Sequence, residues 1–206
     1  ILTAFQNRRS KKRKLYNSLG LILSSAYLLI TLSFKGVAHY KVAEALGENN
    51  IEYKDINTRA TYFNSILWSA QIELEDSYMF TYYSMFDKSM PVFTKKFPKN
   101  HDMLKPFINE KKIQQLIILS NGHYIMSNEN DNLIFWNLKL GQKGFDKNAS
   151  PYIWSYIIEK NNKEQIQLDE TNEKMDALKV KEIRSFRNNR KYSEEFSKFY
   201  ERLKGI

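Results

Sequence analysis

The sequence predicts an α+β fold, with one transmembrane helix followed by an antiparallel-sheet domain with packed helices and a helical C-terminal extension. Three observations support this fold class. A segment of twenty uncharged and mostly apolar residues, 15–34, follows a basic cluster. From residue 51 onward, short stretches alternate between apolar and polar residues, as strands with one buried face do. After residue 160 the chain is polar and contains no proline, a composition that favours helix.

The segment from Leu15 to Phe34 is long enough to cross a bilayer. At about 1.5 Å per residue, twenty helical residues reach roughly 30 Å, the thickness of the hydrocarbon core. A buried core helix and a cleaved signal peptide are alternative interpretations, and a signal peptide has an apolar stretch of about 7 to 15 residues. Serine and threonine weaken the hydropathy, but they are common where membrane helices pack together. We therefore expect a transmembrane helix over residues 15–35.

Positive charge is concentrated just before this helix. The chain has a net charge of +9, and its first 35 residues carry seven basic and no acidic side chains. The other residues hold 25 Lys and Arg against 23 Asp and Glu. This asymmetry follows the positive-inside rule, so everything after Lys35 is expected outside the cytoplasm. A nucleic-acid patch is disfavoured because the charge adjoins an apolar segment. The expected partner is the lipid bilayer, and no nucleic acid is expected.

The residues before the helix are expected to form a separate short unit, 1–14. The apolar residues 1–5 look like the end of a preceding membrane helix, and residues 6–14 would then be a basic cytoplasmic loop. This interpretation implies an upstream portion of the protein.

Residues 36–160 are expected to form an extracytoplasmic α+β domain. A connector helix over residues 36–49 can continue the membrane helix and end near Gly47. A second helix is expected from Met103 to Ser120, with Pro106 in its first turn. Alternation predicts strands over residues 51–60, 62–74, 78–86, 92–97, 123–126, 133–140 and 152–159. We expect one antiparallel sheet with helices on one face.

Residues 161–206 are expected to form a charged helical extension. Asp169 can cap a helix that runs to about Phe186, and Ser193 can begin a second helix. The second helix carries an apolar stripe at helical spacing, formed by Phe196, Phe199, Tyr200 and Leu203. Such a stripe needs a partner surface, either the sheet of its own chain or another subunit or the membrane surface.

The chain has no recognisable catalytic or metal-binding motif. It lacks cysteine, which excludes disulfides, thiolate metal sites and a cysteine nucleophile. Its three histidines, His39, His101 and His123, do not have the spacing of a zinc site. His101 and Asp102 are adjacent, but neighbouring side chains in a loop usually point apart. We therefore assign no catalytic, cofactor-binding or metal-binding residue, and no cofactor is expected in this segment.

Several charged and aromatic residues have both a structural and a functional interpretation. Glu73, Glu75 and Asp76 are expected to be solvated at a turn. A basic and partly aromatic patch could bind an anionic polymer or a lipid headgroup, and its members are Lys95, Lys96, Lys99, Lys105, Tyr82 and Phe97. The near-neutral charge of the domain instead favours a solvated face. Trp68 and Trp136 are expected in the core.

Five sequence blocks, taken in order, resemble a known family. These blocks are Phe63-Asn64-Ser65-Ile66-Leu67-Trp68, Tyr82-Tyr83-Ser84-Met85-Phe86-Asp87, Pro98 to Pro106, Leu119 to Tyr124, and Leu133 to Gly141. With the basic loop and the membrane helix, they resemble the carboxy-terminal half of the bacterial membrane-bound metal-dependent hydrolases, the YdjM-like family. The resemblance covers residues 5 to 160, and the extension after Lys160 is longer than the family leads us to expect.

This resemblance implies a polytopic protein of the bacterial inner membrane, with residues 36–206 on the periplasmic side. It places the metal-binding His and Asp residues in an N-terminal membrane half that precedes this segment. The segment would then be a non-catalytic accessory to a site for a divalent metal such as zinc. The alternative is a membrane-anchored interaction module of a larger envelope assembly, which contacts other membrane or envelope proteins through its C-terminal helices.

Overall fold

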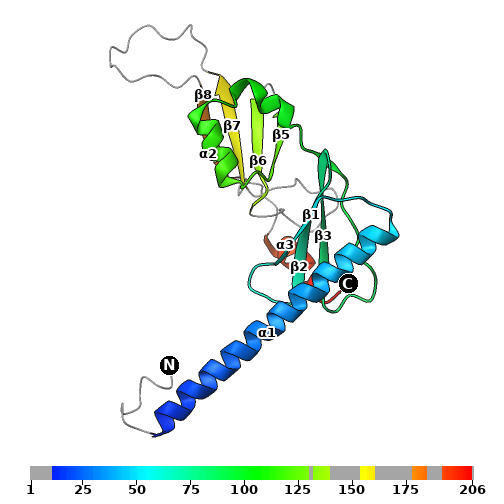
Figure 1. Cartoon of the computed structure of the whole chain (residues 1–206), viewed down its shortest axis with the longest axis vertical. Helices are drawn as coiled ribbons and strands as arrows, with labels where there is room; N and C mark the ends of the chain where they lie inside the picture. The colour runs from blue at the N-terminus through cyan, green and yellow to red at the C-terminus, as the bar shows by residue number, and fades with distance from the viewer. Residues whose placement is uncertain (1–10, 130–131, 140–153, 161–177, 185–191, 206) are drawn as a thin grey trace.

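The computed structural model describes residues 11–129, 132–139, 154–160, 178–184 and 192–205. These residues form one long helix, two antiparallel sheets of four strands each, and shorter helices that pack on the sheets (Figure 1). The α+β class with a single N-terminal apolar helix is therefore confirmed. The expectation of a single sheet is wrong.

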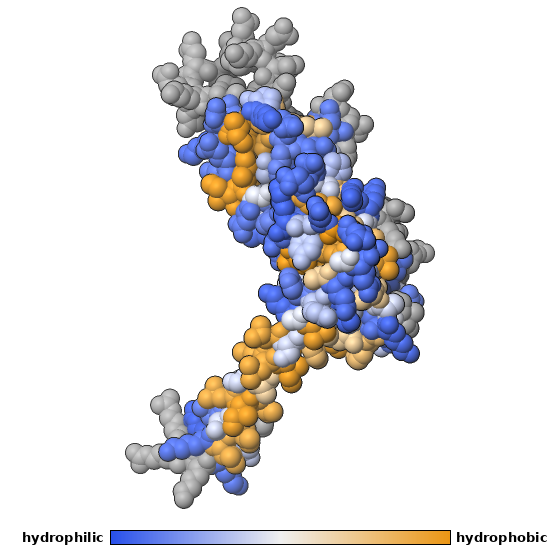
Figure 2. All heavy atoms as spheres, turned by 45° about the vertical axis from the view of Figure 1, so that its right-hand side comes forward, coloured by the Kyte–Doolittle hydropathy of each residue, from blue (hydrophilic) through white to orange (hydrophobic). Residues whose placement is uncertain are grey.

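The first helix, α1 (Lys11–Glu48), has 38 residues and two different environments. Its apolar N-terminal half is exposed on all sides, with Leu23 at 68% and Leu29 at 66%. Its C-terminal half buries Ala38, Val42 and Leu46, each at most 1% exposed, on one face at helical spacing. Figure 2 shows the exposed half as an orange band between a blue end and the mostly blue domain. The connector helix expected over 36–49 is thus the continuation of α1, which is long and apolar enough to cross a membrane.

Sheet A packs against the C-terminal half of α1. Its strands, in spatial order, are β1 (Asp55–Ala60), β2 (Leu67–Glu73), β3 (Ser77–Ser84) and β4 (Phe97–Pro98). The register places Ile56 opposite Ile72 and Ala70 opposite Thr81. Side chains on one face of the sheet form a core with α1, whose members are Val42, Leu46, Ile56, Ala70, Ile72, Leu74 and Met79.

Sheet B is formed by the later strands and has its own core. Its strands are β5 (Tyr124–Glu129), β6 (Asn132–Asn137), β7 (Trp154–Lys160) and β8 (Leu178–Arg184). The 3₁₀ helix η1 (His101–Phe107) and the helix α2 (Lys111–Leu119) contribute to this core. It contains Leu104, Ile113, Leu116, Tyr124, Met126, Phe135, Tyr156 and Ile158.

The two sheets meet through their remaining faces. Successive residues of a strand point to opposite faces, so Tyr78 and Phe80 of β3 face away from α1 while Met79 faces toward it. Tyr78 and Phe80 pack with residues from β4, β5 and the end of β6, namely Phe97, Ile125 and Leu138, and Trp136 packs at the edge of this cluster. Sheet A is therefore covered by α1 on one face and contacts sheet B on the other.

Several expected elements differ from the observed ones. Residues 62–66 are a loop and only 67–73 form the strand, while residues 92–96 are outside any strand. The helix expected over 103–120 is divided into η1 and α2, because Glu110 is extended, with φ −70° and ψ 128°. A proline within η1, Pro106, lacks the backbone donor that a continuous α-helix would use.

The C-terminal extension is also only partly helical. The helix expected to run to Phe186 is wrong over residues 178–184, which form β8 and pair with β7. Pairing provides a partner for the open edge of β7, and this tertiary gain outweighs a local preference for helix. The helix expected from Ser193 is confirmed as α3 (Tyr192–Leu203). Residues 1–10 and Asp169 lie outside the described residues.

Candidate functional site

The junction between the helix and the domain lies where α1 leaves its exposed apolar half. Phe34 and Ala38 of α1 pack with Trp68 at the start of β2 and Tyr83 near the end of β3. The Trp68 indole Nε1 donates a hydrogen bond to the Ser65 carbonyl at 3.0 Å. Trp68 is 5% exposed, so the expectation that it belongs to the core is confirmed. This end of sheet A, where the apolar half of α1 leaves the domain, is called the membrane-proximal end below, on the expectation that this half of α1 crosses a membrane.

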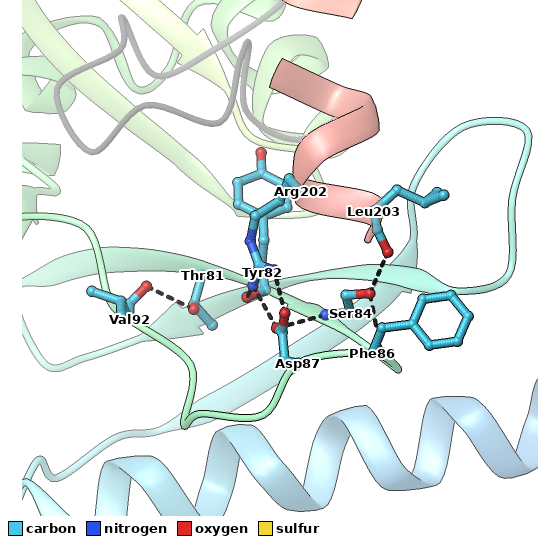
Figure 3. Close-up of polar contacts among 8 residues, drawn as sticks. All are labelled: Thr81, Tyr82, Ser84, Phe86, Asp87, Val92, Arg202 and Leu203. Atoms are coloured by element: carbon cyan, nitrogen blue, oxygen red, sulfur yellow. Dashed lines mark hydrogen bonds and ion pairs between the residues drawn. The ribbon is translucent and has the colours of Figure 1, made fainter. Parts of the chain in front are cut away.

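The helix α3 docks on this same end of sheet A. The Arg202 guanidinium donates to both carboxylate oxygens of Asp87, at 2.5 and 2.6 Å, and to the Tyr82 carbonyl at 2.6 Å (Figure 3). The Ser84 hydroxyl donates to the Leu203 carbonyl at 2.6 Å. Two parallel bonds from a guanidinium to a carboxylate fix both groups in orientation. The end of α3 therefore contacts the sheet of its own chain.

Asp87 is held from two directions. Its side chain is 6% exposed, and Oδ2 also accepts a hydrogen bond from the Ser84 backbone N–H at 2.9 Å. In Figure 3, α3 and α1 lie on opposite sides of sheet A, so the turn that contains Asp87 lies between the two helices. This turn joins the sheet to α3 and lies between α3 and α1.

A second polar cluster lies where the two sheets join. The Lys99 ammonium donates to Glu73 Oε1 at 2.7 Å and to the Glu75 carbonyl at 3.0 Å. His123 Nδ1 lies 3.5 Å from Glu73 Oε2, and the Lys99 ammonium lies 5.1 Å from the Tyr78 ring centroid. The expectation that Glu73 is solvated at a turn is wrong, because its side chain is 23% exposed and paired. Glu75 is exposed and pairs with Lys54 across the surface.

The backbone of residue 99 joins the two sheets. The Lys99 N–H donates to the Asp76 carbonyl at 2.8 Å, and its carbonyl accepts from the Met126 N–H at 3.0 Å. The Asn100 side chain donates to the Met126 carbonyl at 3.0 Å. Burial and the nearby Glu73 carboxylate both raise the pKa of Tyr78, which keeps its hydroxyl neutral. The Glu73, Lys99 and Tyr78 cluster therefore stabilises the contact between sheets.

The histidines have separate partners. His39 Nδ1 lies 3.3 Å from the Thr58 hydroxyl, and His101 Nε2 lies 2.9 Å from the Tyr124 carbonyl, with its ring stacked on Tyr124. Asp102 instead pairs with Lys105 on the surface, which lowers the pKa of Asp102. Among the described residues, no group of three or more His, Cys, Asp or Glu side chains could hold a metal ion.

The structure brings Lys95 and Phe97 of the basic and aromatic patch together, with the Lys95 ammonium 5.5 Å from the Phe97 ring centroid, but it gives Lys99, Lys105 and Tyr82 other partners. Lys99 is paired with Glu73, Lys105 is paired with Asp102, and Phe97 is buried between the sheets. Tyr82 lies on β3, where its carbonyl accepts from Arg202. The residues that were proposed as one binding surface thus belong to different structural contacts.

A small hollow on sheet A has Arg59 in its wall, with Gln71 and Tyr82. The Arg59 guanidinium donates to the Lys139 carbonyl, and it also donates to Gln71 Oε1 at 3.2 Å. Burial lowers the pKa of Arg59. The first contact connects β1 to the segment after β6, and the second connects β1 to β2, so the position of Arg59 is explained by the fold.

Comparison with protein-family models, with curated proteins and with solved structures finds no match to this chain. The resemblance to membrane-bound metal-dependent hydrolases therefore stays a prediction from five short blocks. The geometry that remains for a functional argument is the membrane-proximal end of sheet A and the outer surface of sheet B.

Proposed function

We propose that this chain is a membrane-anchored, non-catalytic domain that holds an interaction surface at a fixed orientation outside the membrane, as a module of a larger envelope assembly. One observation carries the proposal. The helix α1 is exposed and apolar in its first half, and it is part of the core of sheet A in its second half. The same rigid element therefore serves as anchor and as core.

This arrangement fixes the domain relative to the helix axis. A flexible linker would allow the domain to rotate on its anchor. Here α1 continues without interruption from the apolar half into the core, where Val42 and Leu46 are at most 1% exposed. Moving the domain relative to α1 would expose these residues, which costs about 25 cal/mol per Å² of apolar surface. A surface on the domain is therefore presented at a defined distance from the lipid.

The basic cluster before α1 supports an orientation with residues 36–206 on the periplasmic side of a bacterial inner membrane. Lysine and arginine near the end of a spanning helix favour the cytoplasmic side. The described part of this cluster includes Lys12, Arg13 and Lys14, at the opposite end of α1 from the domain. Reporter enzymes fused after Ile206 test the orientation. Activity of a reporter that works only in the cytoplasm, together with no activity of one that works only in the periplasm, would contradict this orientation.

Exposed apolar residues on the outer surface support the interaction role. The helix α2 exposes Ile118 at 74% and Leu119 at 46%, and η1 exposes Met103 beside it. On α3, Tyr200 is 52% exposed while Arg202 contacts the sheet. These residues are available to other membrane or envelope proteins, because the cores of both sheets do not use them.

Native gel electrophoresis of the full chain, extracted from its own membranes in mild detergent, tests this role. We expect Ile118→Ser or Tyr200→Ser to reduce the amount of a larger complex, with Gln114→Ser on exposed α2 surface as the matched control. If the complex keeps its size and yield in both variants, the interaction role is wrong.

An accessory role in a metal-dependent hydrolase is a second candidate. It is favoured by where the matching blocks lie, since residues 63–68 and 82–87 form the membrane-proximal end. The blocks over 98–106 and 119–124 form the junction of the two sheets. In this case a divalent metal such as zinc would be held by upstream membrane helices. Upstream apolar segments that lack His and Asp would contradict this candidate.

A further inference from the structure

The connection between β1 and β2 presents two aromatic side chains to the outside. Tyr62 is 62% exposed, and the side chain of Phe63 is fully exposed. Phe63 also has a φ of 60°, in the left-handed region that bulky residues rarely adopt. Keeping a large apolar side chain in water and in this backbone region costs free energy, and for Phe63 no burial against the described residues offsets that cost. Its placement therefore calls for a partner outside the chain.

The loop is built to hold this position. Asn64 Oδ1 accepts hydrogen bonds from the backbone N–H groups of Ile66 at 3.0 Å and Leu67 at 2.7 Å. Asn64 Nδ2 donates to the Thr61 hydroxyl at 2.7 Å, and the Thr61 N–H donates to the Leu67 carbonyl at 2.9 Å. The two ends of the loop are thereby closed on each other. Phe63 therefore lies in a turn that is fixed by the hydrogen bonds of Asn64, with its side chain exposed to solvent.

The packing of sheet A against α1 shows where this loop lies along the axis of α1. Ala70 and Ile72 of β2 pack in the same core as Val42 and Leu46 of α1. Trp68, earlier in β2, packs instead at the level of Phe34 and Ala38. The strand β2 and the helix α1 therefore run in the same direction, away from the lipid.

Residues that precede Trp68 consequently extend toward the apolar half of α1. Phe63 comes five positions before Trp68, and the loop that carries it connects β1 to β2 at this end of the sheet, where Ala60 pairs with Trp68. Phe34 is the last residue of the apolar segment. The tip of the loop is thus level with the end of the membrane-spanning part of α1. Figure 1 shows this connection at the end of sheet A where α1 leaves the domain.

A third exposed aromatic residue lies at the same end. β3 runs antiparallel to β2, so Met79 packs at the level of Leu46 while Tyr83 and Met85 pack at the level of Ala38. Phe86 follows at the turn and is 58% exposed. The loop 61–66 contains no charged residue, so no charge opposes its contact with lipid. In the turn after β3, the exposed Lys88 follows Phe86 closely in the chain and can reach lipid headgroups.

We propose that Tyr62, Phe63 and Phe86 insert into the interface of the membrane that anchors α1, so that the domain rests on the lipid at three points. Aromatic side chains favour the headgroup region of a bilayer, where a ring is partly dehydrated and a hydroxyl stays hydrated. The inference rests on the proposed membrane anchoring of α1. It adds a second lipid contact that fixes the tilt of the domain.

Single cysteines can test this directly, because the chain contains none. The full chain is reconstituted in vesicles of phosphatidylethanolamine and phosphatidylglycerol, with an environment-sensitive fluorophore on Leu28→Cys, Phe63→Cys or Tyr53→Cys. Tyr53 is the matched control, because it is an exposed aromatic residue at the opposite end of sheet A, next to Lys54, whose N–H bonds to Glu73. Quenching is compared between nitroxide lipids and aqueous iodide.

We expect lipid quenching and a blue-shifted emission at positions 28 and 63, and iodide quenching at position 53. If position 28 is quenched by lipid while position 63 behaves like position 53, the loop insertion is wrong and the anchoring stands. If position 28 is quenched by iodide, the anchoring itself is wrong. A loop that docks on a partner protein would also leave position 63 in water in these vesicles, which contain lipid alone.

A second experiment measures insertion at position 86, so that Phe63 itself can be kept. The fluorophore is placed on Phe86→Cys, and Phe63 is either retained or changed to Ser. We expect Phe63→Ser to reduce lipid quenching at position 86, whereas Tyr53→Ser leaves it unchanged. Equal quenching at position 86 in all three proteins would contradict a joint insertion of the two turns.

Discussion

Arg202 and Asp87 are 115 positions apart in the sequence, yet both carboxylate oxygens of Asp87 accept hydrogen bonds from the guanidinium of Arg202. This contact joins the C-terminal helix α3 to the turn after β3. Arg202 also donates to the Tyr82 carbonyl, so the same side chain contacts the strand and the turn. The end of α3 is thereby part of the domain built on sheet A.

Replacing Arg202 should release α3 from the sheet. We expect Arg202→Met to lower the free energy of unfolding by about 1.5–3 kcal/mol, because the carboxyl group of Asp87, whose side chain is 6% exposed, loses both hydrogen bonds from the guanidinium. Arg202→Lys should recover part of this loss, since it keeps the charge without the two-pronged geometry. Chemical denaturation measures both.

Lys198→Met is the matched control, on an exposed position of the same helix. It removes a similar side chain and a positive charge without removing a sheet contact. An equal loss of stability in Lys198→Met and Arg202→Met would contradict the specific role of the Arg202 and Asp87 pair.

Gly205 should not tolerate a side chain. A Cβ at this position would lie 2.6 Å from the Phe86 carbonyl oxygen, and the residue has a φ of +77°. We expect Gly205→Ala to destabilise the docked C-terminus by about 1–3 kcal/mol, measured as faster proteolysis after α3. Gly47→Ala is the control, because a Cβ there meets open space. If the two variants are cleaved at the same rate, the close approach to Phe86 is wrong.

The Glu73 and Lys99 pair should be energetically coupled across the junction of the sheets. Their side chains are 23% and 12% exposed, so Glu73→Gln leaves a partly buried ammonium without its charged partner. We expect a loss of about 1–3 kcal/mol for the single variant. The double variant Glu73→Gln with Lys99→Met should lose less than the sum of the two single variants.

The surface pair of Lys54 and Glu75 provides the control for this cycle. Glu75 is 76% exposed, so solvent screens its interaction with Lys54. Glu75→Gln should leave the denaturation midpoint unchanged. Additive losses for Glu73→Gln and Lys99→Met would show that the pair does not act as a unit.

Tyr78 should make the fold sensitive to high pH. Burial, and then the charge of Glu73, raise the pKa of Tyr78 above its usual value of 10.0. The folded state therefore favours the neutral hydroxyl. This stabilising contribution is complete below pH 10.0 and is lost as the pH rises from there toward the pKa in the folded state.

An ultraviolet titration of tyrosinate can detect this group. We expect a late-titrating fraction that becomes smaller in Tyr78→Phe, and a smaller loss of stability at high pH in that variant. A titration curve that is identical in the wild type and in Tyr78→Phe would contradict the proposed environment of this hydroxyl.

The long apolar helix could be predicted from the sequence because its signal is local and one-dimensional. Twenty uncharged residues beside a basic cluster require no knowledge of tertiary contacts. The continuation of the helix to Glu48 was also predictable, because apolar residues recur at helical spacing through Val42 and Leu46. The helix α3 followed in the same way from Ser193 and the two glutamates after it, although the helix begins one residue earlier, at Tyr192.

Contacts between distant residues could not be predicted. Glu73 looked like an ordinary turn carboxylate, because its partner Lys99 is 26 residues away and only the fold brings them together. Arg202 gave no signal that distinguishes it from other basic residues of a charged helix. The strand predicted from Tyr62 begins only at Leu67, because the Asn64 side chain accepts hydrogen bonds from the backbone N–H groups of Ile66 and Leu67 and holds residues 61–66 in a loop.

The strand β8 shows a similar limit. Its alternation of Leu178 and Val180 with Lys179 and Lys181 is typical of an edge strand, but the polar composition of the surrounding residues favoured helix. Pairing with β7 decides the outcome, and that pairing depends on sheet B as a whole. Local preference is a weak guide where a neighbouring strand offers backbone partners.

The most direct test of the account is cysteine accessibility along the whole of α1 in native membranes, with a water-soluble maleimide. The account predicts uniform protection over residues 15–34, where lipid surrounds the helix. Beyond residue 36 it predicts alternation at helical spacing, with Ala38, Val42 and Leu46 protected and Val37 and Tyr40 reactive. Helical alternation that also runs through residues 15–34, with one face reactive, would contradict a helix that leaves the lipid and enters the domain core.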